Sequence, residues 1–306
     1  MAREIRYCTT EDGIRIAYSV EGDAPTTILA LPCYVESFAL DHLMPVYQQF
    51  YRDMGEGRRI VRLDWRETGL SADVPAGATP ATNAERVADL KAVATAVGSR
   101  VAVWASTIAG PPAIAFAIAH PDLVTRLILY DTFAAEVNDQ PGRSTHDVLV
   151  ELARTNWDLA AQTIADTNGR REFPEEAAQL GEWYLRSMSG DRFVALMTER
   201  RLRPYEMQDP SRVAVPTLVM HRIADPIIPF SAGQRLAAGI PNARFVPLEG
   251  RGHMFCLGDY SNILVAVDNF LGDRAQGPTC HSHVRPGGSS AVPARSSLPT
   301  SLATPR

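Results

Sequence analysis

The chain has 306 residues, which is long enough for one large domain with a sizeable buried core. Hydrophobic residues make up 45% and charged residues 21%, the proportions of an ordinary globular protein. The net charge of −5 argues against a nucleic-acid partner, which would need a basic face. The cysteines are scattered, with neither a CxxC pair nor metal-ligand spacing, so we expect no metal and no other cofactor. They are Cys8, Cys33, Cys256 and Cys280.

The N-terminal stretch MAREIRYCTTEDGIRIAYSV is charged and strand-like, unlike the apolar core of a signal sequence. No run of about 18 apolar residues is available to span a membrane. These features predict a cytoplasmic protein without a membrane partner that acts on a small-molecule substrate. They leave the oligomeric state open.

Short apolar runs alternate with helical patterns along the first part of the chain. Residues 4–8 and 14–20 alternate apolar and polar side chains around Asp12-Gly13, which predicts a hairpin. Further strands are predicted at 27–32, 59–64, 101–104 and 126–130, and helices at 38–55, 83–97 and about 108–119. Strands that alternate with helices predict an α/β fold, with a mainly parallel, doubly wound sheet covered on both faces.

The alternation breaks between residues 134 and 212. Amphipathic helices without a strand are predicted there, at 145–167, 174–189, 190–202 and near 205–212. Strands at 215–220 and 243–248 and a helix at 260–271 then complete the pattern. We therefore expect a core domain of residues 1–133 and 213–272, a helical lid of residues 134–212, and a disordered tail of residues 273–306.

Residues 101–129, VAVWASTIAGPPAIAFAIAHPDLVTRLIL, form the most informative stretch. They predict a buried strand, a tight turn and an alanine-rich helix. Such a turn lifts one side chain above the sheet, and the N–H groups that follow it point at that side chain. Its usual sequence is G-x-S-x-G, and the matching residues here, 105–109, are ASTIA.

Either Thr107 or Ser106 can stand at this turn. Counted back from His120-Pro121, the spacing resembles the α/β-hydrolase pattern G-x-S-x-G-G-x-x-A-x-x-F-A-x-x-H-P, with Thr107 in the place of the serine. The register with Ser106 would put Trp104 and Ile108 at the close-packed flanks, where neither side chain fits easily. We therefore favour Thr107 as the nucleophile, while an ordinary turn without chemistry stays open.

Two later loops carry the remaining members of a catalytic triad. Residues 216–229 (PTLVMHRIADPIIP) end a strand and place Asp225 in the loop after it. Residues 249–258 (EGRGHMFCLG) follow the next strand and place His253 between glycine and methionine. The order nucleophile, acid, histidine matches that of the α/β-hydrolase fold. Asp131, directly after the strand at 126–130, is the alternative acid.

The resemblance to α/β hydrolases extends to ILALPCYVESFALDHLMP and RIVRLDWRETGLSAD. These stretches look like the oxyanion loop and the D-x-R-G-x-G-x-S segment of the family. They also resemble the hydrolase-like domains fused to class III nucleotide cyclases, although this chain contains no cyclase domain. The resemblance implies a triad of Thr107, Asp225 and His253, with the backbone N–H groups of Tyr34 and Ile108 as oxyanion donors.

The chain departs from this family pattern at several positions. Pro32-Cys33 replaces the usual His-Gly or Pro-Gly, Glu67 replaces a glycine, and alanine replaces both glycines at the turn. We read Cys33 as packing within its loop, because no histidine is assigned to it. Threonine is competent as a nucleophile, but its methyl group restricts χ1 and crowds the path of attack.

Three functions follow from these observations. The first is hydrolysis or transfer of an acyl group of a small apolar ester, lactone or thioester through the Thr-Asp-His triad. The second is proton transfer by His253 and Asp225 in a lyase, cyclase or cofactor-free oxygenase. The third is a catalytically weak ligand-binding or signalling module.

Residues 275–306 contain 14 Pro, Gly or Ser among 32 residues and no aromatic residue. Such a composition buries too little apolar surface to offset the entropy of ordering the chain. Deletion of residues 275–306 should therefore leave the thermal unfolding midpoint nearly unchanged, as measured by calorimetry. A drop of more than a few degrees would show that this segment packs on the rest of the chain.

Overall fold

The computed structural model describes six segments of the chain. They are residues 3–33, 36–71, 79–134, 145–169, 172–202 and 209–272. All of them belong to one compact unit, Met1–Gln276. The expected tail, residues 273–306, lies outside the described residues.

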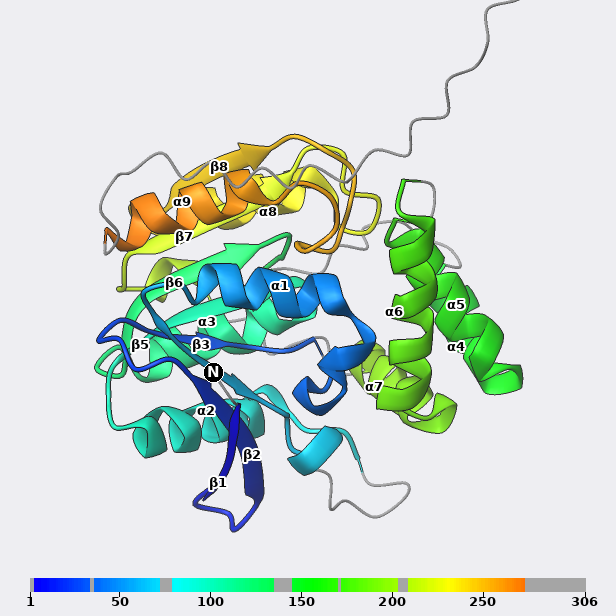
Figure 1. Ribbon diagram of the computed structural model, residues 1–306, viewed down its shortest axis with the longest axis horizontal. Coiled ribbons are helices and arrows are strands. Elements are labelled where there is room, and N and C mark those ends of the chain that lie inside the picture. Colours follow the sequence, from blue (N-terminus) through cyan, green and yellow to red (C-terminus); the bar gives the residue numbers. More distant parts are fainter. Residues whose placement is uncertain are drawn as a thin grey trace, which may run out of the picture. The chain divides into compact units, whose positions relative to one another are not determined.

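The described strands form one eight-stranded sheet in the order β1-β2-β4-β3-β5-β6-β7-β8 (Figure 1). The strands are β1 (Glu4–Thr9), β2 (Arg15–Glu21), β3 (Thr27–Ala30), β4 (Arg59–Leu63), β5 (Val101–Ser106), β6 (Val124–Tyr130), β7 (Thr217–Arg222) and β8 (Arg244–Leu248). β2 pairs antiparallel with both β1 and β4, and the remaining pairs are parallel. The predicted mainly parallel α/β sheet is therefore confirmed.

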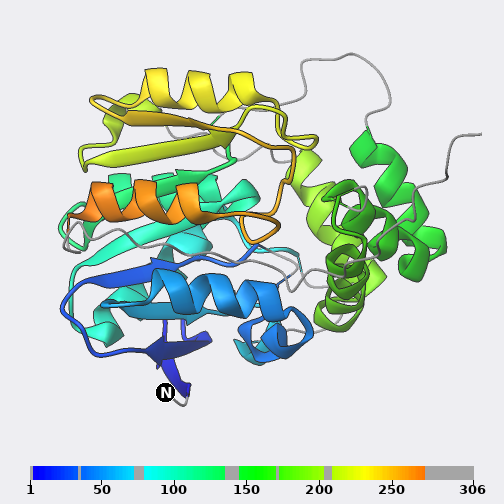
Figure 2. The same cartoon turned by 45° about the horizontal axis from the view of Figure 1, so that its top comes forward.

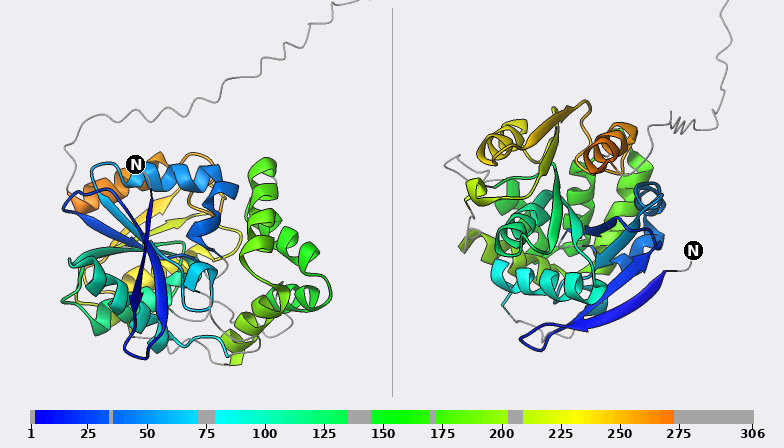
Figure 3. Two further views of the ribbon diagram at one scale, coloured as in Figure 1. Left: turned by 60° about the horizontal axis from the view of Figure 1, so that its bottom comes forward. Right: turned by 90° about the vertical axis from the view of Figure 1, so that its left-hand side faces the viewer.

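Helices cover both faces of the sheet, as Figures 2 and 3 show. α1 (Pro45–Met54) and α9 (Ser261–Leu271) pack on one face, and the opposite face carries α2 (Asn83–Val97), α3 (Gly110–Ala119) and α8 (Phe230–Gly239). Central strand β5 is buried along its whole length. Its alternate side chains enter the two cores, with Val103 on one side and Trp104 on the other.

Four further helices lie between β6 and β7 in sequence. They are α4 (Thr145–Thr155), α5 (Trp157–Thr167), α6 (Pro174–Ser187) and α7 (Gly190–Leu202). The prediction of one helix over 145–167 was wrong, because the chain breaks at Asn156. The Asn156 side chain accepts a hydrogen bond from the Leu159 N–H and so caps α5.

The helix α8 was missed by sequence analysis. Its sequence, FSAGQRLAAG, carries two glycines, which weaken the helical pattern. Gly233 is required by packing, because a Cβ atom there would collide with the His221 ring. Short 3-10 turns complete the described elements: η1 (Phe38–Leu43), η2 (Gly69–Ser71), η3 (Thr107–Ala109) and η4 (Pro210–Arg212). Among the helices in the described segments, none is long and apolar enough to cross a lipid bilayer.

The helix α6 joins the inserted helices to the core through Trp183. This side chain is fully buried, and its ring lies edge-on to Tyr47 of α1 with 4.7 Å between the ring centroids. Trp183→Ala should lower the free energy of unfolding by about 3–5 kcal/mol, the usual cost of deleting a buried aromatic side chain. Urea unfolding followed by circular dichroism measures this change.

Leu159 provides the matched control within the same group of helices, because its side chain is 53% exposed. Leu159→Ala should change the free energy of unfolding by less than about 0.5 kcal/mol. Equal effects of the two substitutions would contradict a packed junction at Trp183.

Candidate active site

The parallel strands bring the predicted site residues to one edge of the sheet. β3, β5, β6, β7 and β8 run in the same direction, so the loops after them meet at their carboxyl ends. These loops carry Cys33, Thr107, Asp131, Asp225 and His253. The helices inserted between β6 and β7 lie beyond the same edge (Figure 2).

Thr107 stands at a strained turn between β5 and the helix that follows. Its φ is +51°, whereas Ser106 is the last residue of β5 and has extended backbone angles, φ −121° and ψ 155°. A positive φ is a clear outlier for a β-branched residue and costs roughly 1–3 kcal/mol. Thr107, and not Ser106, therefore has the backbone conformation of the turn residue.

Two hydrogen bonds to the Thr107 carbonyl hold this turn. One comes from the Gly110 N–H and the other from the Thr132 hydroxyl. A Cβ atom at position 110 would collide with the Thr132 side chain, so only glycine allows this close approach. Sequence analysis did not single out Thr132, whose side chain comes from the loop after β6.

The Thr107 hydroxyl contacts the thiol of Cys33. The distance between Thr107 Oγ1 and Cys33 Sγ is 3.1 Å, and either atom can be the donor. Among the hydrogen bonds of the described residues, none joins Thr107 to His253. The structure therefore brings both residues to one edge of the sheet without linking the hydroxyl to the imidazole.

Asp225 and His253 form a buried, hydrogen-bonded pair. His253 Nδ1 lies 2.8 Å from Asp225 Oδ2, and the two side chains are 7% and 0% exposed. Asp225 Oδ1 accepts the N–H groups of Ile227 and Ile228, at 2.7 and 3.1 Å. The carboxylate therefore has both oxygens occupied and a fixed orientation.

Burial and mutual attraction act in opposite directions on the pKa values of this pair. Burial disfavours both charged forms, but the attraction between the imidazolium and the carboxylate outweighs it. As a result the pKa of His253 is raised and that of Asp225 is lowered. Asp225 therefore stays ionised and holds a proton on His253 Nδ1.

The loop after β3 contains a buried carboxyl group that sequence analysis missed. Glu36 Oε2 accepts the Cys33 N–H and the Tyr47 hydroxyl, each at 2.8 Å. Burial raises the pKa of Glu36 to about 7, although both hydrogen bonds oppose the shift. The signal available in the sequence was an acidic residue within the expected oxyanion loop.

Of the predicted oxyanion donors, Ile108 follows Thr107 in η3, and Tyr34 lies outside the described residues.

Glu67 explains one departure from the family pattern. It has a φ of +84°, a conformation that favours glycine. Its carboxylate pairs with Arg192 of α7 and lies 3.6 Å from Arg86 of α2. Glu67 therefore links the inserted helices to the core, which a glycine in its place would not do.

Comparisons with known proteins agree with this fold. An α/β-hydrolase family profile described as TAP-like protein matches residues 195–278. The AB hydrolase superfamily protein YisY of Bacillus subtilis is 27% identical over 235 residues, which cover 72% of this chain and 83% of that protein. An esterase from Exiguobacterium antarcticum has a similar structure, with a TM-score of 0.72 and 19% identity over 87% of this chain and 98% of the esterase.

The enol-lactonase from Burkholderia xenovorans superposes with a TM-score of 0.67 and 18% identity, over 88% of this chain and all of that one (100%). The chain has the α/β-hydrolase fold. The sequence likenesses are also to α/β hydrolases, over residues 195–278 for the family profile and at 27% identity for the relative. At these identities, the solved structures establish the fold alone.

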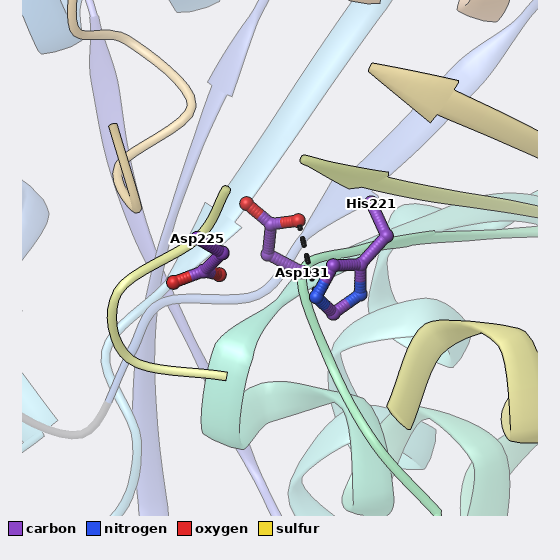
Figure 4. A group of neighbouring side chains, drawn as sticks. All are labelled: Asp131, His221 and Asp225. Carbon is purple, nitrogen blue, oxygen red and sulfur yellow. Dashed lines mark ion pairs between the residues drawn. The ribbon is translucent and has the colours of Figure 1, made fainter. Parts of the chain in front are cut away.

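In this α/β-hydrolase fold, a group of possible metal ligands lies beside the predicted acid (Figure 4). Each of these residues, Asp131, His221 and Asp225, offers one ligand atom, and the three atoms lie within 4.8 Å of one another. However, His221 Nε2 lies 3.0 Å from the Ile228 carbonyl oxygen and must carry a proton to bond with it. Both oxygens of Asp225 are already occupied. In this arrangement neither His221 Nε2 nor the Asp225 carboxylate is therefore available to a metal.

The raised pKa of His253 depends on the charge of Asp225. Asp225→Asn should move the titration of His253 to lower pH, because the attraction is lost while the burial remains. The imidazole resonances in a pH series of NMR spectra measure this change. An unchanged titration of His253 would contradict the coupling between the pair.

Proposed function

We propose that this chain is a hydrolase that cleaves the acyl bond of a small apolar ester, lactone or thioester through Thr107, Asp225 and His253. The observation that carries the proposal is the strained backbone of Thr107 at the edge of the sheet where the Asp225–His253 pair also lies. A positive φ at a β-branched residue is retained where it serves function. The esterase and enol-lactonase likenesses support the same class of reaction.

His253 acts as the base in this mechanism. Its Nδ1 carries a proton toward ionised Asp225, which leaves Nε2 of the neutral imidazole to accept the proton of the Thr107 hydroxyl. For this step the hydroxyl must exchange its contact with Cys33 for one with His253. The Thr107 oxygen then attacks the acyl carbon, the bond from this carbon to the leaving group breaks, and His253 gives its proton to that group. Water then gives a proton to His253 and attacks the acyl-threonine ester, and His253 returns the proton to the Thr107 oxygen as the acid is released.

Negative charge develops on the carbonyl oxygen during attack. The N–H groups of Ile108 and Tyr34 are the proposed donors to this oxygen, and removal of one such donor costs about 2.7–4 kcal/mol of transition-state stabilisation in comparable enzymes. The Trp65 indole N–H holds the start of the oxyanion loop through the Pro32 carbonyl, at 2.9 Å. Glu36 binds the next N–H in the loop, that of Cys33.

The inserted helices favour an apolar substrate, and we propose that they form a lid over the site. The side chains of Trp183 and Tyr184 on α6 are buried, and α6 packs against η1 of the core. Burial raises the pKa of Tyr184, and the nearby Cys33 and Glu36 act in the same direction. The lid therefore brings the ring of Tyr184 close to the loop that contains Cys33.

The contact between Thr107 and Cys33 favours one alternative. If the hydroxyl remains with Cys33, Thr107 binds a substrate oxygen while His253 and Asp225 transfer a proton. Such a protein would be a lyase, cyclase or cofactor-free oxygenase without a covalent intermediate.

Labelling with a fluorophosphonate separates these two mechanisms. The reagent should add one adduct to the intact protein, and peptide mapping by mass spectrometry should place it on Thr107. Thr107→Ser should label faster, because it lacks the methyl group that crowds the attack. Thr107→Ala should not label.

His253→Ala should slow the labelling of Thr107 by about 10²-fold or more, the usual contribution of a general base. An adduct on Ser106 or Cys33 would show that the nucleophile is assigned wrongly. If Thr107→Ala retains most of the activity on an acyl substrate, the covalent mechanism is wrong.

A further inference from the structure

Asp131 is a second buried carboxyl group beside the proposed acid (Figure 4). It follows β6, has a φ of +40° and is fully buried. Its Oδ1 accepts the Arg222 N–H at 2.7 Å, while its Oδ2 is buried and meets no donor in hydrogen-bonding geometry. One of its oxygens lies within 4.8 Å of an oxygen of Asp225. Two such carboxylates cannot both ionise cheaply in a buried site.

The partners of the two groups decide which one keeps the charge. Asp225 has two N–H donors and His253, whereas Asp131 has one N–H donor and the Tyr130 hydroxyl nearby. His221 Nε2, which lies 3.8 Å from Asp131 Oδ1, is committed to the Ile228 carbonyl. Asp225 is therefore the better site for the charge, and Asp131 for the proton.

We propose that Asp131 is a positioning residue that holds a proton in the resting protein and thereby keeps the negative charge of this carboxyl pair on Asp225, next to His253. The proton would lie on Oδ2, the oxygen without a donor. The proposal rests on the roles given above to Asp225 and His253, and it extends them to a third group that sets their charge.

The electrostatics of the surrounding groups support this assignment. Burial raises the pKa of Asp131 to about 7, and the charge of Asp225 acts in the same direction. His253, the Arg222 N–H and the Tyr130 hydroxyl oppose the shift. Ionisation of Asp131 in turn adds negative charge near His253 and raises its pKa. The titrations of the three groups are therefore coupled.

The proposal is tested on the full chain with ¹³C-labelled aspartate. The side-chain carboxyl resonance of Asp131, identified by its loss in Asp131→Asn, should titrate near pH 7, because burial and the charge of Asp225 raise its pKa. The resonance of Asp225 should stay in its ionised position over the same range. Asp131→Asn replaces a neutral group by another neutral group below pH 7, so it should leave the titration of His253 there nearly unchanged, whereas a large shift to lower pH would show that Asp131 carries a negative charge. Asp122→Asn, at an exposed position, should not change this titration.

Stability provides a second readout. Asp131 binds its proton more tightly in the folded chain, so the folded state loses stability as the pH rises from about 3.9, the unfolded value, to about 7. Asp131→Asn cannot bind this proton, so the variant does not lose stability in this way. Relative to wild type, its unfolding midpoint should therefore rise as the pH increases across that window. A pH-independent difference reflects only the preference of asparagine for positive φ and would contradict the proposal.

An Asp131 carboxyl that remains ionised through neutral pH would overturn the proposal. If Asp131→Asn does not fold, assignment of the same carboxyl through its backbone in the wild-type protein decides the question. These measurements need no activity. A failure of the fluorophosphonate labelling would therefore count against the proposed hydrolase, and a failure of the titration would count against the role of Asp131.

Discussion

The left-handed backbone of Thr107 is the constraint on which the site depends. A β-branched residue avoids this conformation, so the surroundings must hold it there. The Thr107 carbonyl is bound from two sides, by Gly110 at the start of α3 and by Thr132 after β6. The central strands thereby fix the position of the hydroxyl relative to the loops that carry Asp225 and His253.

Burial strongly affects which groups at this edge of the sheet are ionised. Asp225, His253 and Asp131 are all withdrawn from water, and burial alone would leave each of them neutral. Asp225 remains ionised because it binds two N–H groups and the imidazole. The result is one negative charge next to His253, as a histidine base requires. Burial likewise raises the pKa of Glu36, in the loop after β3, to about 7.

Much of the fold was predictable because its signals are local. Apolar runs such as 101–104 and the helical spacing of 83–97 identify buried strands and helices, and the helix Asn83–Val97 has the predicted bounds. The break at Asn156 and the helix Phe230–Gly239 were not predicted, since a side-chain cap and a glycine packed on His221 weaken or interrupt the periodicity.

The positions of Thr107, Asp225 and His253 at one edge follow from strand order, which a sequence pattern can indicate. Contacts between distant segments could not be predicted in the same way. The hydrogen bond between Cys33 and Thr107 spans 74 residues, and the ion pair between Glu67 and Arg192 depends on how α7 packs against the core. The roles of Thr107, Asp225 and His253, the lid and the link to cyclase-associated domains remain predictions.

A crystal structure of the protein after reaction with a fluorophosphonate would show directly whether Thr107 is the nucleophile. The account predicts continuous electron density from Thr107 Oγ1 to phosphorus, with a phosphonyl oxygen within hydrogen-bonding distance of the Ile108 N–H and His253 Nε2 facing the bonded oxygen. Phosphorus attached to Ser106 or Cys33 would contradict the account. Reagent bound in the site beside an unmodified Thr107 that still contacts Cys33 would contradict it as well.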